Sequence, residues 1–265
     1  MDYVHGYSAR EHARLTDQAT TLTGLLHAGT SYPAGSRVLE AGCGTGAQSA
    51  ILAARSPQAH FTGIDMSKRS LAAAAQRARR SGCGNVTFRH ADIFDLPFGP
   101  SSFDHVFVCF VLEHLADPAG ALAALRTVLK PGGSITVIEG DHGSAFFHPD
   151  SAAARRAIQC LIDLQRQAGG DPLIGRQLYP LLVRGGYRDI CVSPRTAYAD
   201  GSKPNLAEGL TRKTFAAMVE GIAAQALSHQ LIGRADWATG IADLRRAAGG
   251  GGTFCYTFFK AVAVR

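Results

Sequence analysis

The sequence lacks the features that mark membrane-spanning, secreted and zinc-binding proteins. No run of apolar residues is long enough to span a bilayer, and residues 1–5 do not have the character of a signal peptide. The six cysteines are scattered and none forms a Cys-x-x-Cys pair, so neither a zinc site nor a redox motif is predicted. We therefore expect a cytoplasmic protein with no membrane partner and with reduced, buried thiols.

Charged residues are few, at 18% of the sequence, whereas 46% of the residues are hydrophobic, so the chain can bury a substantial core. Internal repeats and low-complexity linkers are also missing. A length of 265 residues suits one α/β domain with a large insertion. The net charge of +6 permits a nucleic-acid partner without requiring one, because the densest basic residues, between Lys68 and Arg80, are typical of a solvated helix face.

Residues 38–46 combine the end of a strand, a glycine-rich turn and the start of a helix. Glycine lets the backbone approach a ligand closely, and a helix start offers free N–H groups and the positive end of a dipole. The spacing is G-x-G-x-G, and not the G-x-G-x-x-G of dinucleotide sites. An acid, Glu40, precedes the first glycine by two residues. Because a carboxylate repels pyrophosphate, this turn favours a positively charged ligand.

Two of the strands that follow this turn also end in an acid. Asp65 follows the last glycine at close to the spacing of roughly 20 residues at which a carboxylate meets a ribose diol. Asp92 ends the next strand, where its carboxylate can accept a hydrogen bond from an adenine amine. Open α/β sheets bind ligands at the carboxyl ends of their strands, so Glu40, Asp65 and Asp92 define one ligand edge. After the glycine turn, strands are predicted over residues 61–65, 86–92, 103–109, 134–139, 187–193 and 253–263.

Between residues 37 and 140 the sequence resembles the class I S-adenosylmethionine-dependent methyltransferases. The matching segments are 40–46, Asp65, 91–93, 103–104, 112–115 and 129–133. The resemblance implies an α/β fold, with a doubly wound, mostly parallel, seven-stranded Rossmann-like sheet. It also implies S-adenosyl-L-methionine as the cofactor and S-adenosyl-L-homocysteine as the product.

In that family the glycine loop packs against the methionine part of the cofactor, and the acid at the Asp65 position binds both ribose hydroxyls. The Asp92 position binds the adenine amine, and Ile93 beside it packs on the ring. The cofactor-binding residues implied are Glu40, Gly42, Cys43, Gly44, Gln48, Asp65, Met66, Asp92, Ile93, Cys109, Phe110 and Arg14.

The N-terminal segment is predicted to form a helix over residues 8–27, beginning with a capping box. Before it, residues 3–7 place two tyrosines and a histidine around a glycine, which indicates a docked segment: either a staple onto the core or a lid over the methyl-transfer site. As a lid, Tyr7 lies near the sulfonium, because an aromatic face attracts a cation. Further candidates to bind the methionine carboxylate or the substrate are Arg14, Asp17 and Gln18.

Residues 139–144, Glu-Gly-Asp-His-Gly-Ser, follow the strand at 134–139, at the edge where a substrate must lie. Histidine titrates near neutral pH and is the usual general base, so His142 is a candidate catalytic residue. A loop histidine bonded to backbone is the alternative. For Glu139, a candidate catalytic acid, the alternative is capping of the next helix. Together with Tyr7, these residues form the predicted catalytic set.

A long insertion separates the last two predicted strands, although a two-residue turn would suffice geometrically. Long insertions in compact domains are usually functional, so residues 199–252 are interpreted as a helical cap over the substrate pocket or as a dimer face of a homo-oligomer. Helical apolar spacing covers 210–231 and 236–248. The candidate pocket residues Tyr198, Phe215, His229 and Trp237 are ordinary packing residues in the alternative. The expected organisation is one domain, with a lid and helix at 1–30, a cofactor core at 35–145, the rest of the core at 146–198 and 253–265, and the cap at 199–252.

Residues 109–112 after the fourth strand are Cys-Phe-Val-Leu, where base-methylating enzymes often carry an Asn-Pro-Pro-Tyr-like motif. This apolar wall favours a small aromatic substrate over an exocyclic base amine, so a nucleic-acid partner is not expected. No cluster of acids like that of catechol-type enzymes stands near the fourth strand, and we expect no metal. Segments 3–8 and 139–144 further resemble microbial natural-product methyltransferases, some of which methylate indole C3 of tryptophan-derived cyclic dipeptides. That resemblance implies that the cation formed at the indole loses its N–H proton, or is attacked at C2 by a neighbouring amide nitrogen, with pyrroloindoline formation. Tyr7 and His142 would orient the substrate or accept the proton.

Two other interpretations stay open. One is an N- or O-methyltransferase of another small molecule, or of tRNA or protein. The basic pI of about 9.1 favours a tRNA or protein substrate, and strong salt dependence of binding would follow. The other is a cofactor-binding protein without catalysis, against which the complete set of Glu40, Asp65 and Asp92 argues.

Overall fold

The computed structural model describes residues 9–265, apart from the side chains of residues 9–13 and 16. This part of the chain forms two compact units, considered one at a time below. The sheet unit comprises residues 26–140, 174–194 and 259–265. The helical unit comprises the described residues up to 25, together with 141–173 and 195–258. Strands β7 (Arg188–Asp200) and β8 (Thr253–Val264) each contribute residues to both units.

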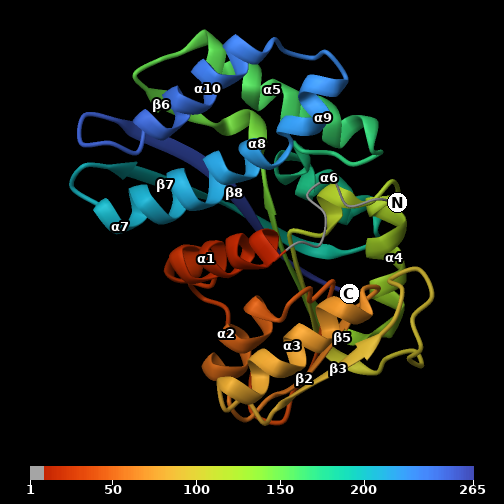
Figure 1. The fold of residues 1–265 in the computed structure, drawn as a ribbon. Coiled ribbons are helices and arrows are strands. Elements are labelled where there is room, and N and C mark those ends of the chain that lie inside the picture. The colour runs from red at the N-terminus through yellow and green to blue at the C-terminus, as the bar shows by residue number, and fades with distance from the viewer. Residues whose placement is uncertain (1–8) are drawn as a thin grey trace. The chain divides into compact units, whose positions relative to one another are not determined.

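The sheet unit is built on parallel strands that alternate with helices (Figure 1). Parallel pairing joins β1 with β2 and β4, β2 with β3, and β4 with β5. The sheet order is β3-β2-β1-β4-β5-β8-β6, with β7 pairing β8, so the direction of winding reverses between β1 and β4. Open α/β sheets bind ligands at such a switch point, outside the carboxyl ends of the strands. The strands are β1 (Arg37–Ala41), β2 (His60–Asp65), β3 (Val86–His90), β4 (Phe103–Cys109) and β5 (Leu129–Gly140).

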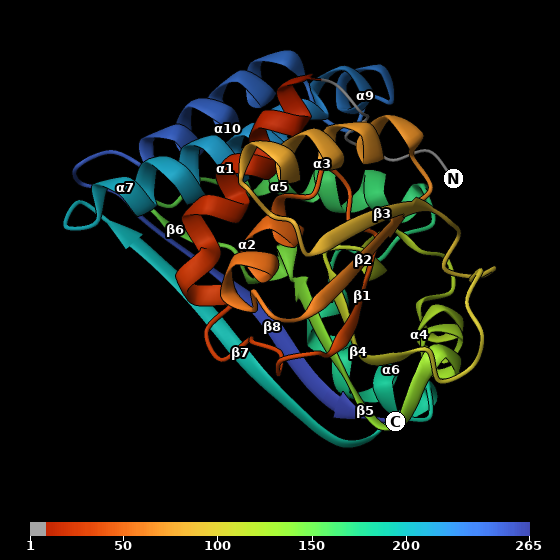
Figure 2. The same ribbon diagram turned by 90° about the horizontal axis from the view of Figure 1, so that it is seen from below.

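Helices cover both faces of these strands (Figure 2), with α2 and α3 on one face and α4 and α6 on the other. Alternation along β4 shows why both faces are apolar, because Val106 and Val108 join the core under α4 and α6 while Phe107 stacks on His27. The helices of this unit are α2 (Ala47–Arg55), α3 (Lys68–Arg80), α4 (Pro118–Val128) and α6 (Leu178–Arg184), with the short 3-10 helices η1 (Leu112–His114) and η3 (Ile174–Gln177).

The helical unit packs α5 (Ala152–Gln167) against α10 (Arg234–Arg246). The contact is close because Gly240 has no side chain: a Cβ there would lie 2.5 Å from the Ala153 carbonyl oxygen. Ser151 caps α5 by accepting a hydrogen bond from Ala154 N, and it donates to Asp243 on α10. The other elements of this unit are α1 (Ala9–Leu26), η2 (His142–Ser144), β6 (Phe146–His148), α7 (Pro204–Leu206), the π-helix η4 (Ala207–Ala216), α8 (Ala217–Gly221) and α9 (Ala223–Ser228).

The helix predicted over 210–231 is the largest departure from the sequence expectation, because it is divided into η4, α8 and α9. Two local features accompany the wide turns of the π-helix. The Thr214 hydroxyl donates 2.7 Å to the carbonyl of Gly209, five residues back, and a Cβ at Gly209 would lie 2.3 Å from Thr21 Oγ1. Apolar spacing alone does not distinguish this backbone from a continuous α-helix.

The predicted doubly wound, mostly parallel sheet is confirmed, with differences in detail. A short eighth strand, β6, pairs antiparallel with the start of β8 and was not predicted. Strand β5 begins at Leu129 and not at 134. The residues of the expected turn, with Gly132 at φ +76°, form part of the strand, and its register against β4 shifts between Phe103 and His105. None of the described helices is both long and apolar enough to cross a bilayer.

Candidate functional site

The turn between β1 and α2 takes three left-handed glycines, at φ +70° for Gly42, +51° for Gly44 and +72° for Gly46. A Cβ at Gly42 would lie 2.5 Å from Val111 Cγ2, and one at Gly46 would lie 2.8 Å from Ala74 Cβ. A Cβ at Gly44 would meet nothing within 4 Å. Two glycines are therefore required for packing, whereas Gly44 leaves its backbone open to a ligand.

Asp65, at the end of β2, is bonded to this turn. Its Oδ2 accepts from Gly44 N at 2.9 Å, and its Oδ1 accepts from Ser67 N at 2.8 Å. Each carboxylate oxygen has a second lone pair, so the pair of oxygens remains able to accept from a ribose diol. The predicted ribose-binding acid is thus held at the one glycine that faces open space.

Glu40, at the end of β1, is buried, with 2% of its surface exposed. Its Oε2 accepts a hydrogen bond from Ser49 Oγ on α2. Burial raises the pKa of Glu40 to about 8, and the nearby Asp65 carboxylate adds to this shift. A positively charged ligand would relieve both effects, whereas a pyrophosphate would increase them. These two carboxyl groups therefore fit a cationic ligand such as a sulfonium with an α-ammonium group.

The next strand end along the edge belongs to β3 and carries Asp92 and Ile93. Asp92 Oδ1 accepts from Phe94 N at 2.9 Å, which fixes the carboxylate, and Ile93 is buried. On the neighbouring strand, Met66 exposes 66% of its surface, and its carbonyl is bonded to His90 Nε2 at 2.9 Å. Because β3, β2 and β1 are consecutive parallel strands, Asp92, Asp65 and Glu40 follow one another along the same edge.

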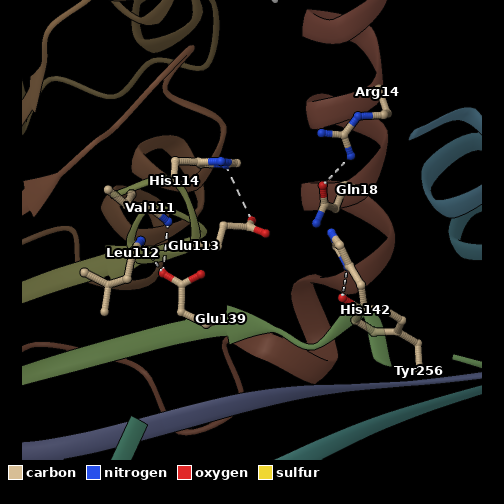
Figure 3. A network of polar contacts seen from close by, with 9 residues as sticks. All are labelled: Arg14, Gln18, Val111, Leu112, Glu113, His114, Glu139, His142 and Tyr256. Carbon is tan, nitrogen blue, oxygen red and sulfur yellow. Dashed lines mark hydrogen bonds and ion pairs between the residues drawn. The ribbon is translucent and has the colours of Figure 1, made fainter. Parts of the chain in front are cut away.

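At the end of β4, Cys109 is buried and Phe110 has φ +57°, which is rare for a residue with a side chain. The following amides are held from β5, because Glu139 Oε1 accepts from Val111 N at 3.0 Å and from Leu112 N at 2.8 Å (Figure 3). Glu139 is fully buried, and burial together with the nearby Glu113 raises its pKa well above the usual range. Glu139 thus binds the two backbone amides at the start of the 3-10 helix η1.

Gln48, on the first turn of α2, forms a hydrogen bond with His27, a residue that the sequence analysis did not identify. Its Oε1 lies 2.6 Å from His27 Nε2, which must therefore carry the proton. His27 is fully buried and stacks on Phe107, with ring centroids 5.7 Å apart. Burial lowers the pKa of His27, so the ring is neutral. No sequence pattern singles out His27, since it precedes the glycine turn and meets Gln48 only after folding.

The remaining predicted residues belong to the helical unit or lie outside the described residues. Arg14 Nη1 donates to Gln18 Oε1 at 3.0 Å, one turn along α1. His142 Nδ1 lies 2.7 Å from Tyr256 Oη, and both side chains are buried (Figure 3). Tyr256 was not anticipated from the sequence. Tyr7 lies outside the described residues, so its predicted catalytic role stays a prediction, as do those of His142 and Glu139.

The four pocket residues proposed for the insertion differ in exposure. Phe215 and Trp237 are buried in the helical unit, and the Phe215 ring meets that of His142 edge to face at 6.2 Å. Tyr198 and His229 are exposed. Among the described side chains, no group of three or more His, Cys, Asp or Glu residues is arranged to hold a metal ion.

Comparison with known proteins points to the same kind of cofactor as the acids at the sheet edge. The profile of a family described as "Methyltransferase domain" matches residues 33–186. O-methyltransferase cnsE of Penicillium expansum is 36% identical over 148 residues, which are 51% of this chain and 52% of that protein. The 27-O-demethylrifamycin SV methyltransferase of Amycolatopsis mediterranei is 34% identical over 134 residues, 50% of this chain and 49% of that protein.

Among solved structures, the [4+2]-cyclase SpnF matches with a TM-score of 0.56 and 23% identity, over 95% of this chain and 80% of that chain. At this identity the likeness shows the fold alone. The chain spans about half the length of the two curated relatives named above. The family profile covers more than half of the chain, and the edge formed by Glu40, Gly44 and Asp65 fits a cationic nucleoside. The chain therefore belongs to the class I S-adenosylmethionine-dependent methyltransferases, and its cofactor is S-adenosyl-L-methionine.

Proposed function

We propose that the protein transfers the methyl group of S-adenosyl-L-methionine to a small aromatic molecule. The specific reaction proposed is methylation of indole C3 in a tryptophan-derived compound, such as a cyclic dipeptide, with closure of a pyrroloindoline ring. The observation that carries methyl transfer is the pair of acids at the glycine turn: Asp65 bonded to Gly44 N, and the buried Glu40 beside it.

The aromatic acceptor is supported by the segment after β4. Cys109 and Leu112 are buried, and the intervening Phe110 and Val111 are half-buried, so this segment offers apolar surface and no amide side chain to hold a base amine. The choice of indole rests on the resemblance of segments 3–8 and 139–144 to indole C3-methyltransferases. One relative compared above is named an O-methyltransferase and the other a 27-O-demethylrifamycin SV methyltransferase, so a small-molecule oxygen is the main alternative acceptor.

The cofactor, when bound, supplies an electrophilic methyl group on a sulfonium. The task of the chain is to orient the acceptor in line with the S–CH₃ bond, to exclude water and to accept a proton where one is released. With an indole acceptor, C3 bonds to the methyl carbon as the S–C bond breaks. The indolium loses its charge when a neighbouring amide nitrogen attacks C2 and releases its proton. His142, held at Nδ1 by Tyr256, is the proposed proton acceptor, and Tyr7 is proposed to orient the ring.

A labelled-methyl transfer assay tests the proposal. The parent protein is incubated with S-adenosyl-L-methionine carrying a labelled methyl group and with tryptophan-containing cyclic dipeptides, simple indoles, phenols or tRNA. Mass spectrometry then locates the added carbon. We expect label on the C3 carbon of a cyclic dipeptide. Label on a phenolic oxygen would replace indole by an oxygen acceptor, and label on tRNA alone would overturn the small-molecule assignment.

The net charge of +6 favours one second candidate, methylation of tRNA. Binding of a polyanion releases counterions, so its affinity falls steeply with salt. We expect turnover of the small acceptor to change little between low and moderate ionic strength. A strong loss of turnover with added salt would support the nucleic-acid alternative.

A further inference from the structure

Glu139 is a buried acid that methyl transfer, as proposed above, does not use. It lies one residue before the end of β5, and its side chain is fully buried. Its Oε1 receives two consecutive backbone N–H groups, from Val111 and Leu112. Within the described residues its Oε2 has no hydrogen-bond partner. One side chain from β5 therefore holds the backbone of a segment that follows a different strand.

The held segment has a backbone that needs support. Phe110 sits at φ +57°, a strained conformation for a residue with a side chain, which persists only where the surroundings impose it. One restraint is the bond from Phe110 N to the Ile138 carbonyl, at 2.9 Å. The bonds to Glu139 fix the next two residues. The chain thus turns sharply at Phe110 with backbone bonds on both sides of the turn.

The fixed segment meets the glycine turn through Val111. A Cβ at Gly42 would lie 2.5 Å from Val111 Cγ2 and 3.0 Å from Cγ1, so the Val111 side chain occupies the space that Gly42 leaves. Gly42 begins the turn whose next glycine, Gly44, donates to Asp65. A continuous set of contacts therefore runs from the Glu139 carboxyl through Val111 to the turn that receives the cofactor.

We propose that Glu139 is a positioning residue for cofactor binding: it holds Val111 against Gly42 and so keeps the glycine turn in the shape that receives the cofactor. This inference rests on the proposed function, because it concerns the same cofactor site. It assigns Glu139 a role that acts through the backbone and not by contact with the reacting atoms.

The charge state of Glu139 suits this role. Burial, with the Glu113 carboxylate nearby, raises the pKa of Glu139 and so favours its protonated form. A protonated carboxyl offers an acceptor oxygen for the two amides and one O–H donor. A glutamine offers the same acceptor with an N–H donor, so Glu139→Gln preserves the restraint. A leucine has a similar volume but leaves two buried N–H groups without an acceptor.

The test is calorimetric titration of S-adenosyl-L-homocysteine into the parent and into Glu139→Gln, Glu139→Leu and Val111→Ala, with the Tm of each variant measured in parallel. Val137→Ala on β5 is the matched control, because it removes the same two methyl groups from a buried site. If the turn holds its shape only about a tenth of the time without the restraint, Glu139→Leu and Val111→Ala bind about tenfold more weakly. Glu139→Gln binds within about threefold of the parent by the same relation.

The outcomes separate this inference from the proposed function. A parent that gives no heat with S-adenosyl-L-homocysteine overturns the cofactor assignment itself. A parent that binds, with Val111→Ala no weaker than Val137→Ala, overturns the positioning role alone, and this holds even if Glu139→Leu fails to fold. If Glu139→Gln binds like the parent but loses methyl transfer, Glu139 is a catalytic acid or base and the positioning role is wrong.

Discussion

The ends of β1 and β5 each carry a buried glutamate, yet the two side chains meet different partners. Glu40 accepts one hydroxyl group, from Ser49, and lies close to a second acid, Asp65. Glu139 accepts two backbone amides and has Glu113 nearby. The first arrangement leaves a carboxyl that gains from an added cation, and the second uses a carboxyl to fix a loop. We therefore propose that equally buried glutamates at one sheet edge serve cofactor recognition in one case and rigidity in the other.

Asp65→Ala should cause the largest loss of cofactor affinity. It removes the acceptor for the ribose diol and leaves Gly44 N without its bond, and two charge-assisted hydrogen bonds together correspond to a loss of about 100-fold or more in affinity. Titration with S-adenosyl-L-homocysteine measures it. Asp104→Ala is the control, because Asp104 also accepts a backbone N–H, from Arg37, but stands near the start of β4 at the opposite edge. Equal affinity of the two variants would remove Asp65 from the site.

Two glycines of one turn should respond differently to alanine. Gly46→Ala combines a left-handed backbone with a contact 2.8 Å from Ala74, and we expect about 3 kcal/mol of lost stability. Gly44→Ala meets no neighbour and should cost only about 1–2 kcal/mol from backbone strain. Its methyl group stands where the ligand approaches, so it should weaken cofactor binding more than its stability loss implies. Urea unfolding measures the loss of stability, and calorimetry measures the loss of cofactor affinity. If the ratio of affinity loss to stability loss were the same for both variants, Gly44 would not lie where the ligand approaches.

Glu40→Gln should change how the stability of the protein depends on pH. Because the folded pKa of Glu40, about 8, lies above its ordinary value of 4.5, the unfolded chain releases this proton first and stability is lost as pH rises from 4.5 to 8. The variant avoids that loss, so between pH 5 and 8 it should gain stability relative to the parent, by on the order of 4 kcal/mol. Its Tm should therefore fall less than that of the parent between pH 5 and 8.

The same substitution should act oppositely on binding. A cationic cofactor favours the ionised carboxyl, so the affinity of the parent for S-adenosyl-L-methionine should rise relative to that of Glu40→Gln as pH approaches 8. Calorimetry in buffers of different ionisation enthalpy should show proton release by the parent that the variant lacks. Equal proton release by both proteins would mean that Glu40 does not sense the ligand charge.

His27→Gln should have the smallest effect. The folded pKa of His27 lies below its ordinary value of 6.5, so the unfolded chain takes up the proton first and the parent loses stability as pH falls below about 6.5. Glutamine keeps a donor for Gln48 and does not titrate. We expect the Tm of the parent to drop further than that of the variant between pH 7.5 and 5. If the Tm of both proteins fell equally with pH, His27 would not be the group that destabilises the parent at low pH.

Local patterns were sufficient for the strand ends. The glycine turn, Asp65 and Asp92 were predicted because each is an acid or glycine directly beside a short apolar strand, and parallel strands bring their carboxyl ends to one edge. Glu139 was identified as an acid at a strand end, but its bonds to Val111 and Leu112 join residues far apart in sequence. Packing between β4 and β5 creates that contact, and no local spacing encodes it.

The insertion shows where periodicity fails. Apolar spacing over 210–231 predicts one helix, because it reports which residues are buried and not how many residues each turn contains. The close contact between Gly209 and Thr21 accompanies a π-helix, and Thr21 lies in α1, far away in the chain. The same holds for His27, the residue after α1, which meets Gln48 on α2 only when the chain has folded.

The sequence by itself determined the fold class, the family and the order of acids along the sheet edge, because these depend on short motifs and on the regular alternation of strands and helices. Only the tertiary structure decided which hydrogen-bond partners and which neighbouring charges each acid meets. That decision depends on desolvation and on hydrogen-bond partners from distant strands, which come together only when the chain has folded.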